Sequence, residues 1–164
     1  MRDNIDRNTG QKWREVMASC TFFGHKECEI DNPIDKLLPV LANLIMNKGV
    51  DTFYVGNQGD FDKTVLIVLR RFQTYFTHIK FSVVLAYHPF VKPYSDFLKA
   101  EETVFPEELE NIHPRFAISK RNEWMISKSD YAVVFVKRPV GGAAKYKELA
   151  EKKGLTVINL HKDR

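Results

Sequence analysis

Short apolar runs alternate along this chain with segments whose apolar residues recur at helical spacing. Several of the runs are apolar on successive residues, which is typical of strands that helices cover on both faces. Alternation of such strands with helices predicts parallel βαβ units. The sequence therefore predicts an α/β fold, a Rossmann-like, doubly wound and mainly parallel sheet of at least five strands, at 19–23, 52–55, 81–86, 131–136 and 155–160.

Four segments with apolar residues three and four positions apart predict the helices between these strands. The first follows Asp31-Asn32-Pro33 and ends before Gly49, so that a cap, a first-turn proline and a terminal glycine agree. The second begins near Asp60 or Asp62, either of which suits a helix cap. The predicted helices cover about 34–45, 60–76, 118–127 and 143–153.

Two segments depart from this rhythm. Residues 1–16 are polar, and we treat them as an N-terminal appendage to a single domain at 17–164. They fit a flexible arm, a short helix at 13–16, or translation upstream of a start at Met17. Residues 87–114 contain four prolines and are too long for an ordinary connection. We expect a partly ordered insertion near the carboxyl ends of the strands, with a short helix near 94–98, which either covers a ligand or forms a surface excursion.

Composition adds modest constraints. A chain of 164 residues with 44% hydrophobic side chains suits one core. A net charge of +4 slightly favours phosphate-bearing ligands, but the basic residues cluster only in pairs. Nucleic acid is therefore a disfavoured partner that is not excluded. No apolar run reaches the roughly 20 residues of a membrane span, and the first residues lack a signal-peptide core, so we expect a cytoplasmic protein.

The two cysteines lack the paired spacing of a zinc site or a redox dithiol. We expect Cys20 and Cys28 to be free thiols, as is usual in a reducing cytosol. The sequence predicts neither a metal site nor a bound cofactor. It leaves the oligomeric state open, and a homo-oligomer is one possibility.

Three loops that follow predicted strands carry the candidate chemistry, because the carboxyl ends of parallel strands share one edge of a sheet. The first contains a glycine and a histidine that suit a phosphate or a ribose hydroxyl. The second, 56–62, combines two glycines and two amides with the start of a helix, which favours an anion. The third, 139–145, offers a Gly-Gly pair as a phosphate cradle. The expected ligand contacts in these loops are Gly24, His25, Gly56, Asn57, Gln58, Gly59, Asp62, Gly141, Gly142 and Lys145.

Each loop also has a purely structural interpretation. A histidine after a strand is often an ordinary loop residue, aspartates cap helices, and glycines form turns for steric reasons alone. The 56–62 loop is neither the dinucleotide G-x-G-x-x-G motif nor a Walker loop. An ordinary nicotinamide dehydrogenase or ATPase is therefore disfavoured.

Taken together, the segments 20–25, 55–62, 118–125, 128–130 and 141–145 resemble the SLOG superfamily, named for the Smf/DprA and LOG proteins. They are most similar to its small YpsA-like members, over about 17–160. The resemblance implies a Rossmann-like fold that binds a nucleotide or a nucleotide-derived ligand, an ADP-ribose-type signal among them. Other members of the superfamily bind single-stranded DNA.

LOG-type members of that superfamily are phosphoribohydrolases, which split the N-glycosidic bond of a nucleoside monophosphate. Arg121 and Met125 match their arginine and methionine, and Gly141, Gly142 and Glu148 match part of their Gly-Gly-x-Gly-Thr-x-x-Glu motif. The resemblance thus implies Arg121 as a ligand contact and, only if the protein is a hydrolase, Arg121 and Glu148 as catalytic residues.

Two positions depart from that motif. Ala144 stands in place of the third glycine and Lys145 in place of the threonine, so that side chains crowd the phosphate turn. We therefore expect a binding protein first, a LOG-like phosphoribohydrolase second and a single-stranded DNA-binding protein third. Asn122 is either a further ligand contact or a buried polar residue that satisfies a nearby loop.

Overall fold

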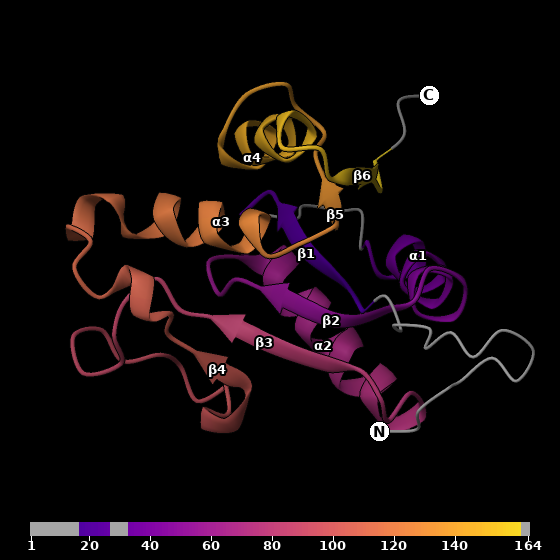
Figure 1. Cartoon of the computed structure of the whole chain (residues 1–164), viewed down its shortest axis with the longest axis horizontal. Coiled ribbons are helices and arrows are strands. Elements are labelled where there is room, and N and C mark those ends of the chain that lie inside the picture. The colour runs from indigo at the N-terminus through magenta and orange to yellow at the C-terminus, as the bar shows by residue number, and fades with distance from the viewer. Residues whose placement is uncertain (1–16, 27–32, 162–164) are drawn as a thin grey trace, which may run out of the picture.

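The computed structural model describes residues 17–26 and 33–161. The appendage at 1–16, the Asp31-Asn32 part of the predicted cap and Cys28 lie outside the described residues. Within them, six parallel strands form one sheet in the order β4-β3-β2-β1-β5-β6 (Figure 1). The strands are β1 (Ala18–Gly24), β2 (Val50–Val55), β3 (Lys80–Val84), β4 (Thr103–Val104), β5 (Tyr131–Phe135) and β6 (Thr156–Asn159).

Helices cover both faces of this sheet, which confirms the Rossmann-like, doubly wound fold. They are α1 (Ile34–Asn47), α2 (Asp60–Tyr75), α3 (Ala117–Ser127) and α4 (Gly142–Lys152). Phe22 packs in the core shared with α1 and α2, whereas Phe23 packs in the core shared with α3 and α4. Val133 and Val134 divide between the two cores in the same way. Burial on both faces explains why the strands are apolar on successive residues.

The predicted helix ends are largely confirmed. Helix α1 begins after Pro33, which occupies the cap position itself, and it is followed by Gly49 at a φ of 67°. Helix α4 is followed by Gly154 at a φ of 84°. Glycine tolerates this left-handed backbone, which ends helices. Helix α2 is capped by Gly59 with no side-chain hydrogen bond, so neither Asp60 nor Asp62 caps it.

The insertion is more ordered than the sequence predicts, and the short helix predicted at 94–98 is wrong. That stretch forms a turn, in which the Leu98 amide donates to the Ser95 carbonyl over 3.0 Å. Further along lies β4, which supplies a sixth strand beside β3. Short 3₁₀ turns cover Ala100–Glu102, Glu107–Leu109 and Pro114–Phe116. A single helical turn is costly to nucleate, and Arg70 holds the Phe97 carbonyl at 2.6 Å instead.

Cys20 is a buried free thiol of β1, and burial raises its pKa well above the ordinary value. It therefore serves as core packing. Among the described residues, no helix combines the length and apolar character that crossing a membrane requires.

Candidate functional site

The ends of β1 and β5 lie side by side where the chain reverses its direction across the sheet. From β1 the strands proceed outward to β4, and the chain then returns to place β5 on the other side of β1. Open α/β sheets bind ligands at such a switch point. A pocket of about 220 Å³ lies there, which we call the strand-end pocket. Its walls come from the loops after β1 and β2 and from α2, α3 and the start of α4.

A buried arginine lines this pocket. Arg121 of α3 is only 2% exposed, and its Nη1 donates to the Val84 carbonyl over 2.7 Å. Its Nε donates to Asn122 Oδ1, also over 2.7 Å. Burial lowers the pKa of Arg121, while the negative charge of Asp62 acts in the opposite direction. An arginine nevertheless keeps its charge in proteins, so a fixed positive charge lies beneath the pocket.

Asp62 brings a carboxylate to the same place. Its Oδ2 accepts a hydrogen bond from the Gln58 amide over 2.8 Å. Burial raises the pKa of Asp62, although Arg121 and the Gln58 amide both favour the charged form. Gly56 lies between the two charges, since a Cβ there would be 3.0 Å from both Arg121 Nη1 and Asp62 Oδ2. Only a residue without a side chain fits this strand end without displacing one of them.

Tight contacts fix the three loops relative to one another. A Cβ at Gly24 would lie 2.2 Å from the ring of Phe61, so the β1 end packs directly on α2. The Asp60 amide donates to the Lys26 carbonyl over 3.0 Å, which joins the first loop to the second. The Lys137 amide donates to His25 Nε2 over 2.9 Å, which joins the first loop to the third. These contacts hold the three loops in place around the pocket.

The start of α4 is the open side of the pocket. Gly141 precedes the helix at a φ of 101°, a conformation that favours glycine. At Gly142, a Cβ would meet nothing within 4 Å, and this residue lines the pocket. The first amides of a helix lack partners within the helix and point toward its N-terminus, where anions bind favourably. The start of α4 therefore offers both open space for a ligand and backbone N–H groups that can donate to it.

The structure brings most of the predicted ligand contacts together. Those that line the strand-end pocket are Gly24, His25, Gly56, Gln58, Asp62, Arg121, Asn122 and Gly142. Asn57 lines a separate, adjoining cavity, and Gly59 packs instead against the Lys26 backbone. Asn122 is also buried, as its structural interpretation expects, but the hydrogen bond that it accepts comes from Arg121 of the same helix and not from a nearby loop.

Three further predicted residues, beyond Asn57 and Gly59, do not line the pocket. Gly141 shapes the turn before α4, and Lys145 is exposed with its Nζ 5.4 Å from the ring of Tyr146. The side chain of Glu148 is 66% exposed and pairs with Lys152 over 2.9 Å. Neighbouring lysines, Lys152 first, lower the pKa of Glu148. Nothing in this position supports Glu148 as a catalytic base for a ligand in the pocket.

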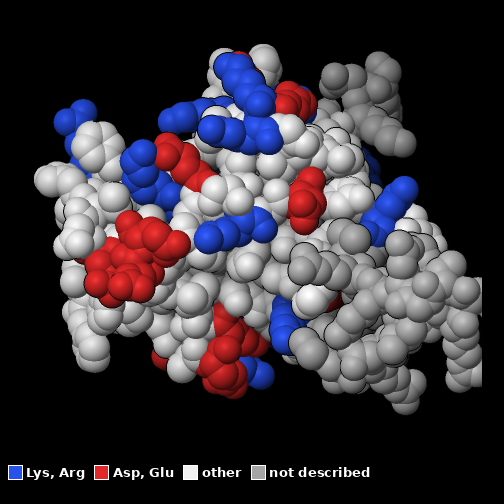
Figure 2. Space-filling view, in the orientation of Figure 1, with Lys and Arg blue, Asp and Glu red and all other residues white. Residues whose placement is uncertain are grey.

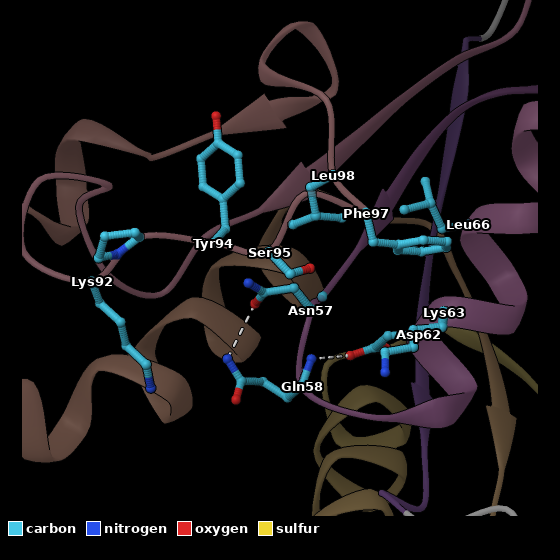
Figure 3. A pocket seen from close by; sticks show the side chains of 12 residues that line it. Asn57, Gln58, Asp62, Lys63, Leu66, Lys92, Tyr94, Ser95, Phe97 and Leu98 are labelled. Atoms are coloured by element: carbon cyan, nitrogen blue, oxygen red, sulfur yellow. Dashed lines mark hydrogen bonds between the residues drawn. The ribbon is translucent and has the colours of Figure 1, made fainter.

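A second cavity of about 310 Å³ adjoins the first and shares Gly56, Gln58 and Asp62 with it. We call it the side cavity. Figure 3 shows Asn57, Gln58 and Ser95 around its centre, with Phe97 and Leu66 on one side. The side-chain amide of Gln58 donates through its Nε2 to Asn57 Oδ1 over 3.1 Å. The insertion therefore lies against the site and supplies one wall of it.

Sequence reasoning missed the contacts that the insertion contributes, among them Lys92, Tyr94 and Phe97. It also missed Tyr146, which lines the strand-end pocket and stacks on Phe23 at 5.4 Å. The available signal in the sequence was the presence of aromatic residues between Pro93 and Pro106. The residues of α2 that line the cavity with them can be identified only from the three-dimensional structure.

A larger hollow of about 610 Å³ lies between the last turns of α3 and α4, lined in part by Ile126, Leu149 and Leu155. None of the predicted site residues lines it. Both helices present their C-terminal ends to it, where a helix dipole disfavours anions. It is the weaker candidate for a phosphate-bearing ligand.

Comparison with known proteins finds no match for this chain, either among models of protein families or among curated proteins. A function for this chain must therefore be argued from the geometry of its site.

Proposed function

We propose that this protein binds a nucleotide or a nucleotide-derived small molecule, an ADP-ribose-type signal included, in the strand-end pocket. One observation carries the proposal: the three strand-end loops meet a helix N-terminus, a buried arginine and a carboxylate around one pocket at the switch point of the sheet. Open α/β sheets bind phosphate-bearing ligands in this arrangement.

Each part of such a ligand has a matching wall. The phosphate would lie at the start of α4, beside Gly142, where the first-turn amides donate. Asp62 would accept hydrogen bonds from the ribose hydroxyls, as carboxylates do in dinucleotide-binding folds. Ile118, Met125 and Tyr146 would form the apolar surface for a base. A pocket with an apolar wall and few convergent polar groups is typical of small-molecule sites.

Binding is favoured over the phosphoribohydrolase alternative because the one catalytic base that the family motif suggests, Glu148, lies exposed and paired outside the pocket. It is also favoured over nucleic-acid binding. Figure 2 shows lysine and arginine side chains over α4 with acidic side chains beside them, and further acidic groups toward β4, so the basic side chains on this face do not form a continuous surface. Membership of the SLOG superfamily and a cytoplasmic location belong to the same proposal.

Thermal unfolding with AMP, ADP-ribose and NAD tests the proposal, with Gly142→Asp and Gly142→Asn as a matched pair. Both variants should fold, since a Cβ at Gly142 meets nothing within 4 Å. At a hundredfold excess over Kd, binding adds about 2.7 kcal/mol, which is roughly 5–10 °C in Tm for a domain of this size. We expect the shift to persist in Gly142→Asn and to vanish in Gly142→Asp, where the new carboxylate repels phosphate.

Two outcomes would contradict the proposal. One is that no nucleotide raises the Tm of the unaltered protein at millimolar concentration. The other is an equal shift in Gly142→Asp, because the ligand would then lie elsewhere. Chromatography of the AMP mixtures separates binding from hydrolysis, since a phosphoribohydrolase would release free adenine and lose that activity in Glu148→Ala.

A further inference from the structure

Phe97 is an exposed aromatic residue in the wall of the side cavity. Its side chain belongs to the insertion, and the residue remains 37% exposed although it faces the apolar side of α2. Leu66 and Leu98 line the same wall. On the other side of the cavity lie the amide groups of Asn57 and Gln58. A planar ring between these walls would meet an aromatic face and hydrogen-bonding edges together.

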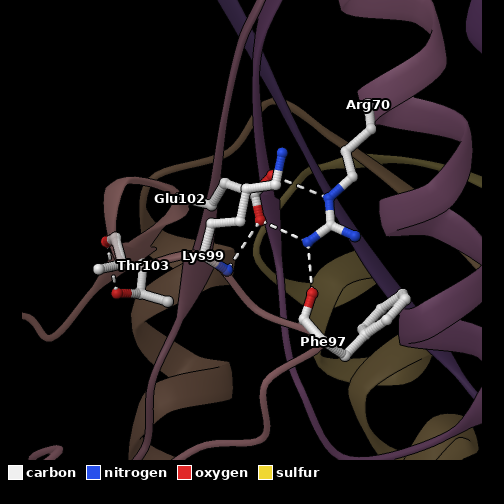
Figure 4. Close-up of polar contacts among 6 residues, drawn as sticks. Arg70, Phe97, Lys99, Glu102 and Thr103 are labelled. Carbon is white, nitrogen blue, oxygen red and sulfur yellow. Dashed lines mark hydrogen bonds and ion pairs between the residues drawn. The ribbon is translucent and has the colours of Figure 1, made fainter.

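The position of Phe97 is fixed by Arg70 of α2 (Figure 4). Arg70 Nη2 donates to the Phe97 carbonyl over 2.6 Å, and its guanidinium lies 4.8 Å from the centre of the phenyl ring. Glu102 holds the same guanidinium through two hydrogen bonds, of 2.8 Å from Nε and 2.6 Å from Nη2. Glu102 is itself only 8% exposed and also accepts from the Lys99 amide.

This arrangement does more than attach the insertion to α2. The Arg70–Glu102 pair and the bond to the Phe97 carbonyl would attach the insertion whichever side chain stood at position 97. In addition, the guanidinium lies over the phenyl ring, and that ring borders the cavity. A rigid aromatic side chain loses little conformational entropy when a second ring stacks on it.

We propose that Phe97 is a stacking platform for a second ring, so that the ligand of this site carries two rings joined through phosphates. This inference rests on the proposed function. The phosphates lie in the strand-end pocket near α4. The ribose that joins them to the second ring lies beside Asp62, Gln58 and Gly56, which the two cavities share. The second ring then stacks on Phe97, with the Asn57 and Gln58 amides at its edge. The chemical class is a dinucleotide joined by a diphosphate.

Isothermal titration with AMP, ADP-ribose and diadenosine diphosphate tests this. ADP-ribose carries the diphosphate and both riboses but lacks the second base, so the ratio of its Kd to that of diadenosine diphosphate isolates the contribution of the second ring. Stacking of a base on an aromatic side chain is worth about a five- to 150-fold change in affinity. We expect that ratio in the unaltered protein and in Phe97→Trp, and a ratio near one in Phe97→Leu and Phe97→Ala.

Phe90→Ala is the matched control, since Phe90 belongs to the same insertion, is 95% exposed and does not line the side cavity. It should keep the full ratio. A ratio that is unchanged in Phe97→Leu, or already near one in the unaltered protein, overturns the stacking role while AMP binding leaves the proposed function intact. If none of the three compounds binds, both the proposed function and this inference fall. Phe97→Leu retains an apolar side chain, so it reports stacking even if Phe97→Ala does not fold.

Discussion

Replacing Gly24 by alanine tests how tightly the first loop packs on α2. The added Cβ would lie 2.2 Å from Phe61 Cγ, 2.3 Å from Cδ1 and 2.6 Å from Cβ. These separations are far inside van der Waals contact, so either the ring or the strand must move. The ring has little room, because Phe61 is 1% exposed and stacks on Phe135 at 6.0 Å.

Overpacking of a core typically costs about 1–3 kcal/mol. We expect Gly24→Ala to reach the upper end of that range, because the clash involves the stem of the ring and not a flexible tip. The φ of Gly24 is not among the positive values, so backbone strain adds nothing and the cost is steric. Urea unfolding followed by circular dichroism measures this cost. The matched control is Gly142→Ala, where the same added methyl group meets nothing within 4 Å and should be neutral or stabilising.

A double-mutant cycle then tests whether Phe61 is the residue that clashes with the added methyl group. Phe61→Ala alone should cost about 3–5 kcal/mol. In that background, the two closest contacts of the new methyl group are gone, while the 2.6 Å contact with Cβ remains. Gly24→Ala should therefore cost about 0.5–3 kcal/mol less than it does alone. Additive effects, or a Gly24→Ala variant as stable as the unaltered protein, would refute the reasoning.

Two further predictions concern buried charges. Arg121→Met should lose about 3–5 kcal/mol of stability, because it leaves the Val84 carbonyl and Asp62 without their cation, whereas exposed Arg71→Met should change urea unfolding by less than about 0.5 kcal/mol. Glu102→Gln should lose about 1.5–3 kcal/mol at neutral pH. Hydrogen bonding from Arg70 lowers the pKa of Glu102 in the folded state, so this difference is present above its ordinary value of 4.5 and fades as the pH falls below it. Urea unfolding curves at several pH values, from ~3 to ~7, check the trend. A difference that persists in acid would contradict it.

Much of the fold could be predicted from the sequence because its signals are local. Phe22-Phe23 and Val133-Val134 are consecutive apolar pairs, which a strand buried on both faces accommodates. Gly49 follows the last apolar residue of a helical pattern, where its positive φ is needed. The sixth strand was not predictable in this way, since β4 has only two residues and exists through its pairing with β3.

The loops of the candidate site were also predictable, since glycines and polar residues follow buried strands. Their individual roles were less so. Gly24 was expected to let a ligand approach, whereas the structure shows that it makes room for Phe61. Gly59 likewise makes room for the Lys26 backbone. A glycine pattern shows that something approaches the backbone closely, but it does not distinguish a ligand from the protein itself.

The insertion shows why the side cavity escapes sequence reasoning. Phe97 has no periodic pattern around it, and its position depends on Arg70, 27 residues earlier, and on Glu102, which meets Arg70 across 32 residues. The position of the Phe97 ring is thus set by Arg70 and Glu102, which lie elsewhere in the chain. Under the proposed function, the strand-end loops would supply the anion site, as the switch points of open α/β sheets commonly do. What distinguishes one ligand from another must therefore come from the insertion, and Phe97 is the residue there at which to test it.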